Sequence, residues 1–237
     1  MAEPGVNPPI VNLVVVAHPD DEVLGMGGTG AKLVARGEIV QPVMLCGHAE
    51  ARTKRPEDGD FFEDIDKAMG VVGFAEPVLG SFPNIKLNTV PHLDLVQFIE
   101  KQVLQFRPKR VFTHHPGDLN DDHGQVSRAT MVAARFSHRR DDLAPVESLH
   151  LMETLSATDW TFPSVGDPFR PNEYVAIDET IEAKLEACHC YRKVMRPFPH
   201  SRSEEAIRGL AAKRGAECGL GLAEAFQTIF STRLNQD

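Results

Sequence analysis

The sequence predicts an α/β fold: a Rossmann-like, doubly wound, mostly parallel sheet with helices on both faces and a C-terminal extension. Two observations predict it. Between residues 10 and 145, runs rich in β-branched residues alternate with segments that place apolar side chains on one helical face. Glycine, proline or polar residues separate these segments. Such alternation of strands and helices builds parallel sheets that are covered on both sides.

The first segments show this alternation clearly. A strand at residues 10–17 is predicted from an almost unbroken apolar run, which suits a buried parallel strand. The helix at 25–36 is expected to end at Gly37, because glycine is favoured just after helix C-termini. A second strand at 38–46 and a polar loop at 47–59 follow.

The next segments repeat the pattern. Their helices are predicted because apolar residues recur with a period of about 3.6. Asn120 or Asp121 is expected to cap the last of these helices. The expected elements are a helix at 61–72, a strand at 76–82, a helix at 91–106, a strand at 110–113 and the capped helix up to about residue 136.

The last third of the chain is less regular. Its expected elements are strands at 148–153 and 174–177 and helices at 180–195 and 203–217. With 237 residues, the chain is expected to form a single domain, 1–237. In this domain a core at about 10–145 carries an extension, about 146–237, that covers the site.

The composition excludes several functions. The net charge of −9 argues against nucleic-acid binding, which needs a basic face, and against an electrostatic membrane anchor. No apolar run approaches the roughly 18 residues of a membrane-inserted helix, and the N-terminus does not resemble a secretion signal. The protein is therefore expected in the cytoplasm. Cys188-His189-Cys190 lies in an expected helix, where side chains two residues apart diverge, so it is interpreted as structural.

A cluster of charge follows the first strand. His18, Asp20, Asp21 and Glu22 come directly after the apolar run. Carboxylates beside a core lose hydration and repel one another, so they need a cation or a proton. The cluster therefore predicts a divalent metal, with a spare carboxylate beside it that can take a proton from water.

A second cluster, residues 114–123, follows the fourth strand. In doubly wound sheets the first and fourth strands commonly lie side by side, and ligands bind at their carboxyl ends. His18, Asp21 and His123 would then meet as nitrogen and oxygen donors suited to Zn²⁺, with Fe²⁺ as the alternative. The competing interpretation is that these acidic residues only cap helices.

A glycine-rich motif offers a different reading. Residues 25–30 match the G-x-G-x-x-G pattern of dinucleotide-binding folds, and Glu50 follows at a suitable distance. In that fold, however, the glycines turn at the strand tip, whereas here residues 18–24 intervene. The glycines are therefore expected to let the first helix pack closely beside the metal loop.

Several of these segments resemble the LmbE/PIG-L family of zinc-dependent N-deacetylases. The resemblance covers residues 10 to about 230. Its strongest part is Ala17-His18-Pro19-Asp20-Asp21-Glu22 with the later pair Asp122-His123. It also includes Phe82-Pro83-Asn84, residues 114–120 and residues 195–200. It implies metal ligands at His18, Asp21 and His123 and a general base at Asp20.

One position departs from the family pattern. Many members carry a histidine three residues before the last metal ligand, where it helps stabilise the oxyanion, and this chain has Asn120 there. An amide could perform the role, or another side chain could. His200 is the first substitute, since related enzymes bring a C-terminal histidine over the metal, and His115 is the second.

The resemblance implies hydrolysis of the N-acetyl group of a GlcNAc-type sugar, a small molecule. Basic residues in an acidic protein suggest a phosphate- or nucleotide-linked sugar, although such residues also complement helix dipoles. The candidate substrate residues are Arg52, Asn84, Arg196 and Arg202. The alternatives are a hydrolase of another small N-acyl amide and a non-catalytic, metal-dependent binding protein. A homo-oligomer stays open.

Overall fold

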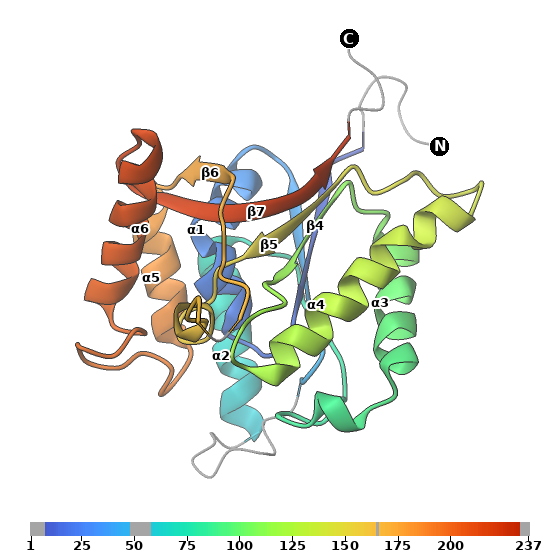
Figure 1. The fold of residues 1–237 in the computed structure, drawn as a ribbon, viewed down its shortest axis with the longest axis horizontal. Helices are drawn as coiled ribbons and strands as arrows, with labels where there is room; N and C mark the ends of the chain where they lie inside the picture. Colours follow the sequence, from blue (N-terminus) through green and yellow to red (C-terminus); the bar gives the residue numbers. More distant parts are fainter. Residues whose placement is uncertain (1–7, 48–57, 165, 233–237) are drawn as a thin grey trace.

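The computed structural model describes residues 8–47, 58–164 and 166–232, and its centre is one sheet of seven strands (Figure 1). The order across the sheet is β3-β2-β1-β4-β5-β7-β6. All neighbouring pairs are parallel except those that β7 makes with β5 and β6. The strands are β1 (Val11–Val16), β2 (Ile39–Met44), β3 (Val78–Leu79), β4 (Arg110–His114), β5 (Ser148–Met152), β6 (Glu173–Ala176) and β7 (Ala223–Ser231).

Helices cover both faces of this sheet, which confirms the predicted fold class. In Figure 1, α3 and α4 lie on one side, and α1, α2, α5 and α6 lie on the other. The long helices are α1 (Asp21–Ala35), α2 (Asp58–Val72), α3 (His92–Phe106), α4 (Asp121–Ala134), α5 (Ile181–Cys190) and α6 (Glu204–Cys218). Among the described residues, no helix combines the length and the apolar character needed to cross a membrane.

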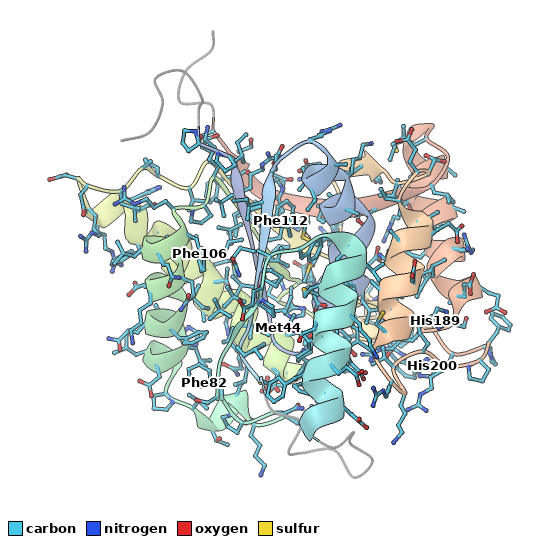
Figure 2. The ribbon with its side chains drawn as sticks, turned by 180° about the vertical axis from the view of Figure 1, so that it is seen from behind. Met44, Phe82, Phe106, Phe112, His189 and His200 are labelled. Atoms are coloured by element: carbon cyan, nitrogen blue, oxygen red, sulfur yellow. The ribbon has the colours of Figure 1, made fainter. Side chains whose placement is uncertain are left out.

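The strand residues divide between two apolar cores. Val14 and Val16 face the core beneath α1, α2, α5 and α6, whereas Leu13 and Val15 face the core beneath α3 and α4. Alternate side chains of a strand point to opposite faces, so a central strand must be apolar at every position. Met44 and Phe112 belong to the first core (Figure 2). Because β5, β6 and β7 extend the same sheet, we propose that the core and the C-terminal extension form one domain.

Three expectations about secondary structure were wrong. The first helix begins at Asp21 rather than at residue 25, because the chain turns at Asp20, whose φ is 110°. Strand β7 was not expected at all, since Glu224 interrupts its apolar pattern at a buried position. The helix expected at 180–195 also ends earlier, at Cys190, and residues 191–203 form a loop. The four cysteines are free, and Cys188 is buried in the core.

Glu224 stabilises an interruption in α1. The helix breaks at Met26, where φ is −149°. The Glu224 carboxylate accepts hydrogen bonds from the amides of Gly28 (3.1 Å) and Thr29 (2.6 Å), at the start of the second half of the helix. It also pairs with the Lys184 ammonium at 2.6 Å, and both side chains are buried. One ion pair therefore joins β7, α5 and the broken helix behind the metal loop.

Replacing Glu224 with alanine is expected to lower the free energy of unfolding by about 3–5 kcal/mol. The substitution leaves a buried ammonium and two amide donors without the carboxylate. Urea unfolding followed by circular dichroism measures the change. Glu205→Ala, on the exposed face of α6, is the control and should stay near the wild type. The double variant Lys184→Met/Glu224→Gln should be more stable than Glu224→Ala; an equal loss would mean that the charge pair is not the cause.

Candidate functional site

The site lies where the loops after β1 and β4 meet. These strands pair directly, with Val15 opposite Thr113, so their carboxyl ends share the lower edge of the sheet in Figure 1. This adjacency confirms the prediction that the first and fourth strands lie side by side. His18 comes from the loop after β1, Asp21 from the first turn of α1, and His123 from the first turn of α4.

The three side chains converge in a buried cluster. Asp21 Oδ2 lies 3.2 Å from His18 Nδ1 and 3.3 Å from His123 Nε2. The exposed fractions of His18, Asp21 and His123 are 3%, 1% and 1%. Asp21 Oδ1 has no hydrogen-bond partner among the described residues, and a buried polar atom without a partner is costly. A bound cation would satisfy it, so the residues fit a metal. Two further groups that could hold a cation each share one of these histidines.

Each histidine of the cluster also has a carboxylate within hydrogen-bonding distance of the ring nitrogen that faces away from Asp21. His18 Nε2 lies 3.0 Å from Asp122 Oδ2, and His123 Nδ1 lies 2.9 Å from Asp118 Oδ2. Such partners orient metal-binding imidazoles and make them more basic. Burial lowers the pKa of His123, but the charge of Asp21 and the bond to Asp118 outweigh it and raise that pKa to about 9. The cluster is therefore strongly stabilised by positive charge at its centre.

Asp122 is itself held by the backbone. Its carboxylate accepts hydrogen bonds from the amides of Ile85 (2.6 Å) and Leu87 (3.0 Å). Asn120 caps α4, because its side-chain oxygen accepts from the Asp122 amide at 3.1 Å. The segment after β3 thereby fixes the carboxylate that orients His18.

His114 packs against the cluster. Its ring stacks on His123, with centroids 3.8 Å apart and planes inclined by 15°. His114 Nε2 accepts a hydrogen bond from the Ala17 amide at 2.9 Å. Burial and the neighbouring charge of His123 hold the pKa of His114 well below its usual value. A neutral His114 therefore ties the loop after β1 to β4 without adding positive charge.

Asp20 lies beside the cluster and is 1% exposed. Its carboxylate accepts a hydrogen bond from Arg202 Nη1 at 3.0 Å, and its amide donates to Glu22 Oε2 at 3.0 Å. Tyr191 donates its hydroxyl hydrogen to the other oxygen of Glu22. Burial raises the pKa of Glu22 to about 8. These contacts hold the left-handed turn at Asp20 and the direction of its side chain.

The candidates for oxyanion stabilisation occupy different places. His200 is exposed on the loop beyond α5 (Figure 2), and its Nδ1 accepts from the Arg202 amide at 3.0 Å. His115 is buried edge-on against Phe169, and its Nδ1 accepts from the Gly117 amide. Asn120 uses its oxygen as the helix cap, which leaves its amide hydrogens as donors.

The candidate substrate residues are also dispersed. Arg202 contacts Asp20 and the Leu155 carbonyl, whereas Arg196 is exposed. Asn84 is 6% exposed, and its side-chain oxygen has no hydrogen-bond partner among the described residues. Arg52 lies outside the described residues.

Sequence reasoning missed several residues of this site. The sequence alone predicts no role for Asp118 or His114, and Asp122 enters it only as a possible helix cap and as part of the family motif. A signal existed, because a metal-binding histidine usually needs an acceptor for its other nitrogen, and residues 114–123 hold three carboxylates. The contact between Arg202 and Asp20 joins residues far apart in the chain, so no spacing rule could have found it.

Two sequence comparisons match this chain to known proteins. The family model described as GlcNAc-PI de-N-acetylase (PIG-L) matches residues 13–134. The chain is 30% identical over 131 residues to the "uncharacterized deacetylase YaiS" of Escherichia coli (strain K12), a match that covers 52% of this chain and 67% of YaiS. The residues that the family model matches include both loops that carry the cluster.

Solved structures share the fold at lower identity. The N,N'-diacetylchitobiose deacetylase of Pyrococcus horikoshii has a TM-score of 0.74 and 20% identity, over 92% of this chain and 83% of that one. GalB, the 4-carboxy-2-hydroxymuconate hydratase of Pseudomonas putida KT2440, has a TM-score of 0.73 and 18% identity, over 96% and 99%. One fold thus carries two reactions, so the reaction must be argued from the site. The matched family model shows that this chain belongs to the PIG-L family of LmbE-like deacetylases.

Proposed function

We propose that the protein is a metal-dependent deacetylase that hydrolyses the N-acetyl group of a GlcNAc-type sugar and releases acetate and a free amine. The observation that carries this proposal is the buried group of His18, Asp21 and His123 with the Asp20 carboxylate beside it. A binding protein would need no carboxylate next to the cation. Membership of a deacetylase family and the likeness to a chitobiose deacetylase support the choice of substrate.

We assign the metal to His18, Asp21 and His123, with Zn²⁺ as the first choice and Fe²⁺ as the second. Two histidines and one carboxylate with an open position form a common catalytic zinc site. The same donor set also suits non-haem iron. When bound, the ion would polarise the acetamide carbonyl and acidify a water molecule.

The protein side chains perform the proton transfers. Asp20 takes a proton from the attacking water while the water oxygen bonds to the carbonyl carbon. The amide C–N bond then breaks, and Asp20 returns the proton to the leaving nitrogen. Arg202 holds the Asp20 carboxylate during both steps. One of three side chains donates a hydrogen bond to the oxyanion: the Asn120 amide, the His200 imidazole or the His115 imidazole. His200 can donate from Nε2, since its Nδ1 is already an acceptor.

The test measures metal content and acetate release on protein purified without chelator. The substrates are N-acetylglucosamine, N,N'-diacetylchitobiose, UDP-N-acetylglucosamine and a set of N-acetyl amino acids. About one metal per chain, with acetate release that a chelator abolishes and Zn²⁺ or Fe²⁺ restores, would support the proposal. Metal with release only from N-acyl amino acids would favour another amide. Metal with sugar binding and no release would favour the non-catalytic binding protein. UDP-N-acetylglucosamine tests the phosphate-linked sugar.

The substitutions Asp118→Asn and Asp122→Asn are each expected to weaken metal binding by about 10- to 100-fold. Each substitution removes the carboxylate that orients one histidine of the cluster and stabilises positive charge on it. Competition with a chelator of known affinity measures the change. Asp121→Asn is the matched control, because Asp121 is exposed on α4 and contacts neither histidine. Equal affinities for all three variants would remove Asp118 and Asp122 from the metal site.

A further inference from the structure

Two aromatic side chains are exposed side by side after β5. Trp160 is 53% exposed and Phe162 is 52% exposed. Their ring centroids lie 5.9 Å apart with planes inclined by 69°, so the rings form an open corner. A single exposed aromatic residue needs no explanation, whereas a pair that meets at the rim of a site can bind a ligand.

The segment that carries this corner is hydrogen-bonded to the candidate active site. Thr161, which lies between Trp160 and Phe162 in the sequence, donates its hydroxyl hydrogen to the Gly117 carbonyl at 2.6 Å. Gly117 precedes Asp118, the partner of His123. The segment carrying the corner is thus fastened to the loop that orients a proposed metal ligand.

A second contact joins the same segment to the proposed base. Arg202 donates from Nε to the Leu155 carbonyl at 3.2 Å and from Nη1 to the Asp20 carboxylate at 3.0 Å. Leu155 begins the turn that leads to Trp160 through η3 (Thr158–Trp160). Two hydrogen bonds, at Leu155 and at Thr161, therefore fasten the segment that carries the corner to residues that contact Asp20 and precede Asp118.

The chemistry of the corner selects its ligand. The C–H face of a pyranose ring packs on an aromatic face, and aromatic walls with a few polar groups are typical of small-molecule sites. Residues 154–167 contain Asp159 and Asp167 and no lysine or arginine. Arg170 pairs with Asp167 at 3.4 Å, and the nearby Arg202 is bonded to the Asp20 carboxylate. The segment therefore offers no unpaired cation to a phosphate, whereas an uncharged sugar needs none.

We propose that Trp160 and Phe162 form a subsite for a second, uncharged sugar ring, attached to the ring that is deacetylated. This inference rests on the proposed function and narrows it: the preferred substrate is a disaccharide or longer saccharide rather than a single or nucleotide-linked sugar. The corner binds the distant ring and so sets specificity, whereas Asp20 acts at the acetamide.

The first test uses Trp160 as a reporter, because it is the only tryptophan of the chain. Asp20→Asn suppresses turnover, and the emission of the otherwise complete, metal-loaded protein is titrated with N,N'-diacetylchitobiose (called chitobiose below), N-acetylglucosamine and UDP-N-acetylglucosamine. A saturable shift with chitobiose alone is expected. No shift with chitobiose overturns the subsite. A shift in Trp160 emission that depends on protein concentration and not on sugar also overturns the subsite, since the corner would then contact a second copy of this chain.

The second test uses wild-type kinetics as its reference. Trp160→Ala is expected to lower the ratio of kcat/KM for chitobiose to kcat/KM for N-acetylglucosamine by about tenfold, and Trp160→Phe should recover most of it. Ile229→Ala, an exposed apolar side chain on β7, is the control. An unchanged ratio overturns the inference while acetate release upholds the proposed function. If no sugar releases acetate, the proposed function fails, and the fluorescence titration still decides the subsite.

Discussion

Replacing Asp20 with asparagine is expected to lower kcat for acetate release by about 100- to 10,000-fold while metal content stays at the wild-type level. Asparagine cannot take a proton from water, so the reaction loses its base. The substitution preserves the structure, because asparagine tolerates the left-handed backbone that Asp20 adopts at a φ of 110°. Its side-chain oxygen can still accept the hydrogen bond from Arg202.

The measurement combines kinetics with metal analysis on the same preparation. Asp64→Asn is a useful control, since Asp64 is a buried carboxylate that pairs with Arg192, away from the cluster. It should leave kcat unchanged. Near-normal turnover by Asp20→Asn would assign the base to another group. Loss of metal by the same variant would instead make Asp20 a ligand.

The position of the site could be predicted from the sequence because it depends on a general rule of topology. The first and fourth strands are neighbours, and their carboxyl ends carry His18 and His123. The rule needs only the order of the elements, so small errors in their boundaries did not matter. The same reasoning could not place β7, because its position between β5 and β6 depends on antiparallel pairing that no local pattern announces.

The inner arrangement of the site could not be predicted, for a physical reason. Asp20 turns into the left-handed region, which its own sequence does not require, and contacts from Arg202 and Glu22 hold it there. Likewise, Arg202 is one of the basic residues that suggest a phosphate-linked substrate. In the folded chain its guanidinium contacts the Asp20 carboxylate, and the nearby Arg192 pairs with three acidic residues of α2. These ion pairs, which the sequence does not show, reduce the positive charge that the two arginines offer to a substrate.

Replacing His123 with glutamine is expected to abolish metal binding and to lower activity by at least about 1,000-fold. His123→Gln keeps a polar side chain of similar size but loses the imidazole nitrogen that faces Asp21. Only His18 and Asp21 then remain as ligands, and two ligands rarely hold a catalytic zinc ion. Chelation of the wild-type protein should reproduce the loss of activity.

Adding metal back distinguishes the chelated wild-type protein from the His123→Gln variant. Added Zn²⁺ should return activity to the chelated wild type and not to His123→Gln. His138→Gln, at an exposed histidine of η2 (Arg135–Arg139), should behave as the wild type throughout. Wild-type metal content in His123→Gln would place the ion elsewhere, and the group of His18, Cys46 and Asp122, which does not include His123, would then be the position to test. Full activity after chelation would instead show that the reaction does not need the metal. The buried carboxylates would then have to act as a protonated pair.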